Sequence, residues 1–117
     1  FMRHRKVGTT LDRKKAPREL MLRNLAASVL LYEKVKTTEA KAKAVRSLVE
    51  RAITVSKTGT LAARRSLIQT LPQPMAVKKA MDVLGKRYNE RAGGYTRLVK
   101  LDRRVGDGAA MVQIELV

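Results

Sequence analysis

The spacing of the apolar residues differs between the main part of this chain and its C-terminal end, and the difference determines the class of fold. Over most of residues 17–84, apolar positions recur every three or four residues, as on one face of an α-helix. Between residues 111 and 116 they alternate with other residues, as in a strand whose sheet has one buried face. We therefore predict an α+β fold, with four main helices and a small three-stranded sheet.

The first two helices are predicted from apolar residues at helical spacing and from residues that favour a helix N-terminus. One begins at Pro17, because proline is tolerated at a first helical position, and its inward residues are Leu22, Leu25, Ala26, Val29 and Leu30. The next begins after Thr37 or Thr38, either of which can cap it. Its inward residues are Val45, Leu48, Val49, Ala52 and Ile53.

Two further helices follow a glycine. Gly59 is expected to adopt the left-handed conformation that ends the second helix, and Thr60 to cap a third helix over residues 61–71. Pro74 then opens a fourth helix that runs until Gly85. A helix-turn-helix motif built from these last two helices is an alternative, although such motifs have a tighter turn.

Three segments are predicted as strands. Residues 32–38 suit an edge strand with Val35 at its centre. Residues 95–101 and 110–116 are expected to pair in antiparallel fashion across the turn-rich sequence DRRVGDGA.

Net charge restricts the class of partner. The 117 residues include 26 Lys and Arg but only 10 Asp and Glu, a formal charge of +16. An excess of this size opposes compaction unless a polyanion neutralises it, which points to nucleic acid. A solvated basic surface is the simpler alternative. A membrane surface is another, but few aromatic anchors are present and no apolar run approaches 18 residues.

Two regions concentrate the positive charge. Residues 2–16, counted from Met2 as the natural start, are basic and lack apolar periodicity. We expect them to form an arm that becomes ordered when it binds phosphates; a disordered terminus is the alternative. Residues 86–104 hold seven cations and only two acids. Gly93 and Gly94, and then Gly106 and Gly108 just after this range, let a phosphate approach the backbone. For the cations of the second helix, Lys41, Lys43, Arg46 and Arg51, we favour a solvated face.

The composition of the chain offers few residues for catalysis. The chain has no Cys and one His, so neither a nucleophilic triad nor a zinc site can be assembled. Asp102, Asp107 and Glu115 suggest a magnesium nuclease as an alternative, although ion pairing or turn formation explains the two aspartates more simply. We expect no enzyme, cofactor, metal or small-molecule substrate. The lack of Cys and of a leader predicts a cytoplasmic protein.

Folded RNA suits this chain better than duplex DNA, because phosphates are crowded in it and 2′-hydroxyls are accessible. Base-by-base reading of a single strand is not expected, since Trp is absent and the three Tyr residues are far apart in the sequence. Affinity should be electrostatic and should weaken steeply with salt.

Four segments in order, MRHRKVG, KTTEAKAKAVR, RAGGYTR and GDGAAMVQIELV, resemble the bacterial large-subunit ribosomal protein L17 family over nearly the whole chain. The resemblance implies a compact α+β body over residues 17–117 with a small mixed sheet, and an arm over residues 2–16 buried in 23S rRNA. It also implies a place near the polypeptide exit tunnel beside neighbouring large-subunit proteins, and a structural role in the ribosome without catalysis.

The candidate RNA-binding residues combine the charge analysis with the positions that match these segments. In the arm and at the start of the first helix they are Arg3, His4, Arg5, Lys6, Gly8, Arg13, Lys14, Lys15 and Arg18. In the C-terminal part they are Arg91, Gly93, Gly94, Tyr95, Arg97, Lys100, Arg103 and Arg104.

Overall fold

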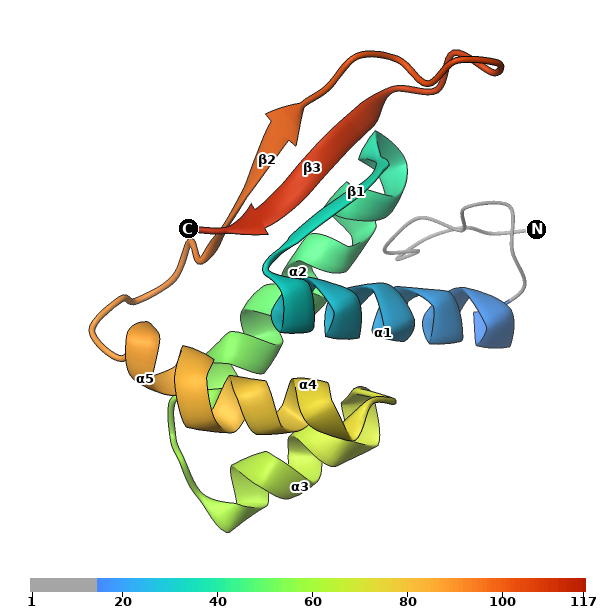
Figure 1. Cartoon of the computed structure of the whole chain (residues 1–117). Coiled ribbons are helices and arrows are strands. Elements are labelled where there is room, and N and C mark those ends of the chain that lie inside the picture. Colours follow the sequence, from blue (N-terminus) through green and yellow to red (C-terminus); the bar gives the residue numbers. More distant parts are fainter. Residues whose placement is uncertain (1–14) are drawn as a thin grey trace, which may run out of the picture.

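A computed structural model describes residues 15–117 of the chain, and Figure 1 shows the arrangement of its elements. In chain order these are α1 (Lys15–Tyr32), β1 (Lys34–Thr38), α2 (Glu39–Ser56), α3 (Leu61–Thr70), α4 (Pro74–Lys79), the π-helical turn η1 (Ala80–Leu84), α5 (Gly85–Arg87), β2 (Thr96–Lys100) and β3 (Met111–Leu116). The predicted α+β class is confirmed.

The helices α1 and α2 lie between the sheet and the remaining helices (Figure 1). Both contact β3, while α3 packs on α2 and α4 packs on α1. The apolar residues predicted to face inward pack together between these elements. Fully buried are Val29 and Leu30 of α1, Val49 and Ile53 of α2, and Ile114 of β3. Burying each such side chain stabilises the fold by about 1.5 to 3 kcal/mol.

The sheet has the order β1-β3-β2, and both of its pairings are antiparallel. The expectation of a mixed sheet was therefore wrong. β1 and β2 run in the same direction, but β3 lies between them, so no parallel pair forms. The prediction that residues 32–38 supply an edge strand is confirmed by β1.

The register of the strands gives the sheet one inner and one outer face. Val35, Ile114 and Leu98 are opposite one another across the three strands, and they face the helices, where Ile114 is fully buried. The next row, Lys34, Glu115 and Arg97, therefore points to the other face, because successive residues of a strand alternate. No helix among residues 15–117 covers that outer face (Figure 1).

The helix boundaries follow the predicted signals with three differences. Gly59 has the expected left-handed conformation (φ +66°), and the Thr60 hydroxyl accepts a hydrogen bond from the Ala63 amide at 3.1 Å. Thr38 is at the N-cap position of α2, but its hydroxyl makes no capping bond. The Glu39 amide instead donates to the Ala110 carbonyl at 2.9 Å.

The second difference is at α1, which begins at Lys15, two residues before the predicted start. Pro17 is thereby the third helical residue. It is tolerated there because amides of the first turn have no partner within a helix.

Gly85 does not end the fourth helix as predicted. The segment from α4 through η1 to α5 is continuous (Figure 1), and Gly85 itself is helical with φ −58°. The glycine is required by packing instead. A Cβ atom at this position would lie 2.7 Å from the Ser56 carbonyl oxygen at the end of α2. Its small size lets the two helices approach closely.

Glu33 makes the connection between α1 and β1. It adopts φ +68°, an uncommon conformation for a residue with a side chain, and its amide donates to Val29 of α1 at 2.8 Å. Its carboxylate accepts a hydrogen bond from Lys79 at 2.8 Å and others from Arg87. Arg87, and after it Lys79, lower the pKa of Glu33 to about 2 from an ordinary 4.5. This residue thus joins the end of α1 to α4 and α5.

Candidate nucleic-acid interface

The predicted arm residues lie outside the described part of the chain. These are Arg3, His4, Arg5, Lys6, Gly8, Arg13 and Lys14. Lys15 begins α1 and Arg18 follows on its first turn, where it is half-buried. The structure therefore bears on the C-terminal candidates, which it distributes over a turn, both faces of β2 and the β2–β3 loop. Lys100 is exposed at the end of β2, opposite Val112, and so lies on the face of Leu98 rather than on that of Arg97.

Side chains that donate hydrogen bonds to backbone carbonyl groups hold the turn at Arg91–Gly94 in place. The Arg91 carbonyl accepts hydrogen bonds from the Lys57 ammonium and, at 3.1 Å, from the Tyr95 hydroxyl. The Arg91 side chain donates from Nε to the Gly93 carbonyl at 3.3 Å. Gly94 has φ +64°, which favours glycine. Open space surrounds Gly93, so a phosphate can reach this turn.

Tyr95 does not belong to the contact surface, and its prediction as an RNA-binding residue was wrong. Its side chain is only 1% exposed, and its ring lies 5.2 Å from that of Tyr88. Two tyrosines that are separate in the sequence thus meet in the core. The Lys57 ammonium donates to the Tyr95 hydroxyl at 3.0 Å and lowers its pKa. Tyr95 therefore supports the Arg91–Gly94 turn from within the core.

The outer face of the sheet holds one carboxylate that has two cationic partners. Arg97 donates from Nε to Glu115 at 2.6 Å, and Lys34 lies 3.9 Å from the same carboxylate. Lys36 is on the same face two residues further along β1. Glu115 is 5% exposed beneath these side chains, and Arg97 is the main cause of its lowered pKa.

One of the seven cations of residues 86–104 thus faces a carboxylate from outside that range, because Arg97 pairs with Glu115. Arg97 uses only Nε on Glu115, and its two terminal nitrogens make no hydrogen bond within residues 15–117. The Arg97 side chain is 63% exposed. Glu115 therefore orients Arg97 while leaving the fork that suits phosphate oxygens available.

The β2–β3 loop, residues 101–110, is stabilised by its own polar groups. Arg104 forms a two-pronged pair with Asp107, at 3.1 and 2.5 Å. Arg104, and after it the Ala109 amide, lower the pKa of Asp107 to about 2. Arg103 donates to the Gly108 carbonyl at 2.8 Å. The predicted ion-pairing role of Asp107 is confirmed, and both arginines remain exposed beside the glycine turns.

The alternative of a metal-dependent nuclease has no site in the described structure. Within residues 15–117 no group of three or more His, Asp or Glu side chains could hold a metal ion. Asp107 and Glu115 each accept hydrogen bonds from an arginine instead. In the same range, no helix combines the length and the apolar character needed to cross a membrane.

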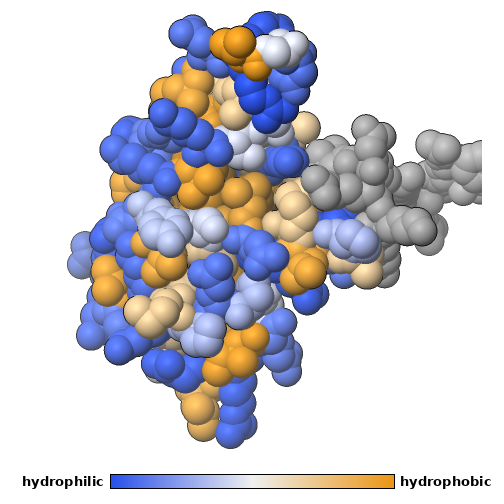
Figure 2. All heavy atoms as spheres, turned by 45° about the vertical axis from the view of Figure 1, so that its right-hand side comes forward, coloured by the Kyte–Doolittle hydropathy of each residue, from blue (hydrophilic) through white to orange (hydrophobic). Residues whose placement is uncertain are grey.

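Sequence reasoning missed Lys57, the residue that ties the end of α2 to the Arg91–Gly94 turn. It is 38 residues from Tyr95 in the chain, and no local pattern marks it. Hydrophilic residues cover most of the face shown in Figure 2, with apolar residues in small separate patches. Arg91, Arg97, Arg103 and Arg104 are all exposed, and guanidinium groups suit phosphate oxygens geometrically.

Comparison with known proteins identifies the family of the chain. The model of the family described as "Ribosomal protein L17" matches residues 21–117. A "Large ribosomal subunit protein bL17" of Solibacter usitatus is 53% identical over 116 residues, which cover 99% of this chain and 77% of that protein. Proteins of the same name from Caldanaerobacter subterraneus and Dehalococcoides mccartyi are 47% and 46% identical, with 99% of this chain covered in each case. The chain belongs to the ribosomal protein L17 family.

Proposed function

We propose that this protein is a structural constituent of the large ribosomal subunit. The observation that carries the proposal is the family membership, together with similarity to relatives named as large-subunit proteins along 99% of the chain. The charge of +16 supports it, because ribosomal RNA supplies the polyanion that such a chain needs.

We infer that the partner is 23S rRNA and that binding uses phosphate contacts. The Arg91–Gly94 turn, the outer face of the sheet with Arg97, and Lys100, Arg103 and Arg104 form the contact surface of the body. The arm residues 2–14 extend it along the RNA. By binding separate RNA segments, the protein stabilises their relative positions without making or breaking covalent bonds.

The place of the protein follows from the same proposal. It lies near the polypeptide exit tunnel, in contact with neighbouring large-subunit proteins, in ribosomes of the cytoplasm. It requires no cofactor and no small-molecule substrate.

Sedimentation through a sucrose gradient tests this function. The tagged full chain, expressed in a bacterium, is expected to travel with large ribosomal subunits and to crosslink to 23S rRNA after irradiation. Treatment with RNase should release it, whereas treatment with DNase should not. A chain that travelled with DNA would overturn the proposal and would favour the helix-turn-helix alternative.

A further inference from the structure

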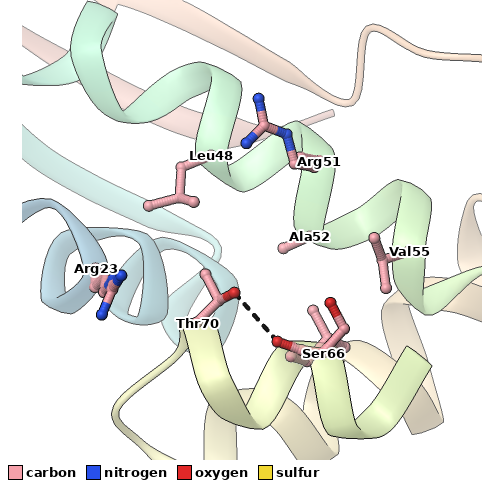
Figure 3. Close-up of a pocket in the computed structure, with 8 residues that line it drawn as sticks. Arg23, Leu48, Arg51, Ala52, Val55, Ser66 and Thr70 are labelled. Carbon is pink, nitrogen blue, oxygen red and sulfur yellow. Dashed lines mark hydrogen bonds between the residues drawn. The ribbon is translucent and has the colours of Figure 1, made fainter. Parts of the chain in front are cut away.

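A groove separate from the surface described above lies between α1, α2 and α3 (Figure 3). Its volume is about 220 Å³, which is room for one planar base but not for a double helix. Leu48, Ala52 and Val55 of α2 and Leu67 of α3 contribute apolar lining. Arg23 of α1 and Arg51 of α2 are also on its wall, together with the hydroxyl residues Ser66 and Thr70 of α3.

Among residues 15–117, the two arginines have no acidic partner. Neither Arg23 nor Arg51 forms an ion pair within residues 15–117, and no Asp or Glu lines the groove. Lys43 and Arg46 on the same helix as Arg51 do pair, with Glu39 at 2.9 Å and Glu50 at 3.4 Å. Lys43, Arg46 and Arg51 are all exposed, as a solvated face requires. Arg51 in addition lines the groove, where no Asp or Glu of residues 15–117 opposes its charge.

The hydroxyl groups add hydrogen-bonding capacity to the apolar lining. Thr70 donates to the Ser66 carbonyl at 3.1 Å (Figure 3), and its oxygen retains acceptor capacity. The Ser66 hydroxyl makes no hydrogen bond in the described part of the chain, so it is available as a donor and an acceptor. An apolar lining with hydroxyls at one side matches the flat face and the polar edge of a nucleobase.

We propose that this groove binds a single unpaired nucleotide of the ribosomal RNA. Its base lies against the apolar lining with its edge toward Ser66, and Arg23 and Arg51 bind the phosphates on either side. Guanidinium groups suit this position, because they pair with phosphate oxygens and also stack on bases. The inference rests on the proposed rRNA-binding function and adds to it a second contact region on the helical side of the fold.

The test measures binding of the full-length protein to 23S rRNA as a function of salt concentration. Arg23→Ser and Arg51→Ser should each weaken binding about tenfold or more and reduce the slope of log K against log salt by roughly 0.7 to 0.9. Arg65→Ser is the matched control, since Arg65 is exposed on α3 about 200° around the helix from Leu67. It should change neither quantity.

A second variant tests the base rather than the phosphates. Ser66→Phe fills the groove without changing charge. Base-specific chemical probing of the RNA should show one base that is protected by the wild type and by Arg65→Ser but exposed with Ser66→Phe. Circular dichroism of each variant checks that the fold is retained, and a variant that loses the fold is replaced by Ser66→Leu.

The outcomes separate this inference from the proposed function. If the wild type itself fails to bind 23S rRNA with a salt-dependent affinity, the proposed function is wrong. If the wild type binds and the Arg23, Arg51 and Ser66 variants all behave like Arg65→Ser, only the nucleotide groove is wrong. Normal RNA binding combined with poor incorporation into subunits would assign the groove to a protein neighbour and would also overturn it.

Discussion

The backbone of Gly85 lies against the carbonyl group of Ser56, where a Cβ atom would be only 2.7 Å from the oxygen. This contact joins the end of α2 to α5. No rotamer can relieve such a clash, because both contacting groups belong to or adjoin the main chain.

Gly85→Ala is therefore expected to lower the free energy of unfolding by about 1 to 3 kcal/mol, the usual cost of overpacking. Urea denaturation measures this. Gly93→Ala is the control, since nothing lies within 4 Å of the position and its φ is not in the left-handed region. If both variants had the same stability, the close approach of the two helices would be refuted.

Arg97→Ala is expected to weaken binding to 23S rRNA by about 1 to 3 kcal/mol, the range for a hydrogen bond to a charged group. The slope of log K against log salt should fall by roughly 0.7 to 0.9. Filter binding over a series of salt concentrations provides both values, with Arg65→Ala as control. An unchanged slope would remove Arg97 from the phosphate contacts.

Glu33 predicts a dependence of stability on pH. Its pKa in the folded protein is about 2, below the ordinary 4.5. A depressed carboxyl pKa stabilises the fold above the unfolded value, so the contribution is complete above about pH 4.5 and is lost as the pH falls toward 2.

Glu33→Gln should consequently reduce the stability at pH 7 by about 1.5 to 3 kcal/mol and flatten the loss between pH 4.5 and 2. Urea titrations at several pH values measure both effects. Glu90→Gln is the control, because Glu90 is exposed and has no ion pair within residues 15–117. Equal pH profiles for wild type and Glu33→Gln would contradict the assigned role.

A chain that begins at Lys15 should keep its stability within about 0.5 kcal/mol, because α1 and the core remain complete. Its affinity for 23S rRNA should fall, and the salt slope should decrease by up to about 4 as five arm cations are lost. A full-length variant with those five cations replaced by Gln separates charge from length. Global unfolding of the shortened chain, seen by circular dichroism, would contradict the prediction.

Local patterns in the sequence were sufficient for the helices, the strands and the Gly59–Thr60 boundary, because each depends on residues close together in the chain. They failed where partners come from distant elements. Glu115 reaches Arg97 only through the pairing of β2 with β3, so a count of acids within residues 86–104 missed it. The burial of Tyr95 depends on Lys57 and Tyr88, which no periodicity connects to it.

The order of the strands has a consequence for association between copies of the protein. Within residues 15–117, β1 and β2 each leave a row of backbone groups unpaired at an edge of the sheet, and such edges can template aggregation. Lys34 and Lys36 on one edge and Arg97 on the other belong to the same outer face, so these cations would be forced together if two copies joined side by side. Their repulsion disfavours such joining, and a polyanion that neutralised them would remove this protection.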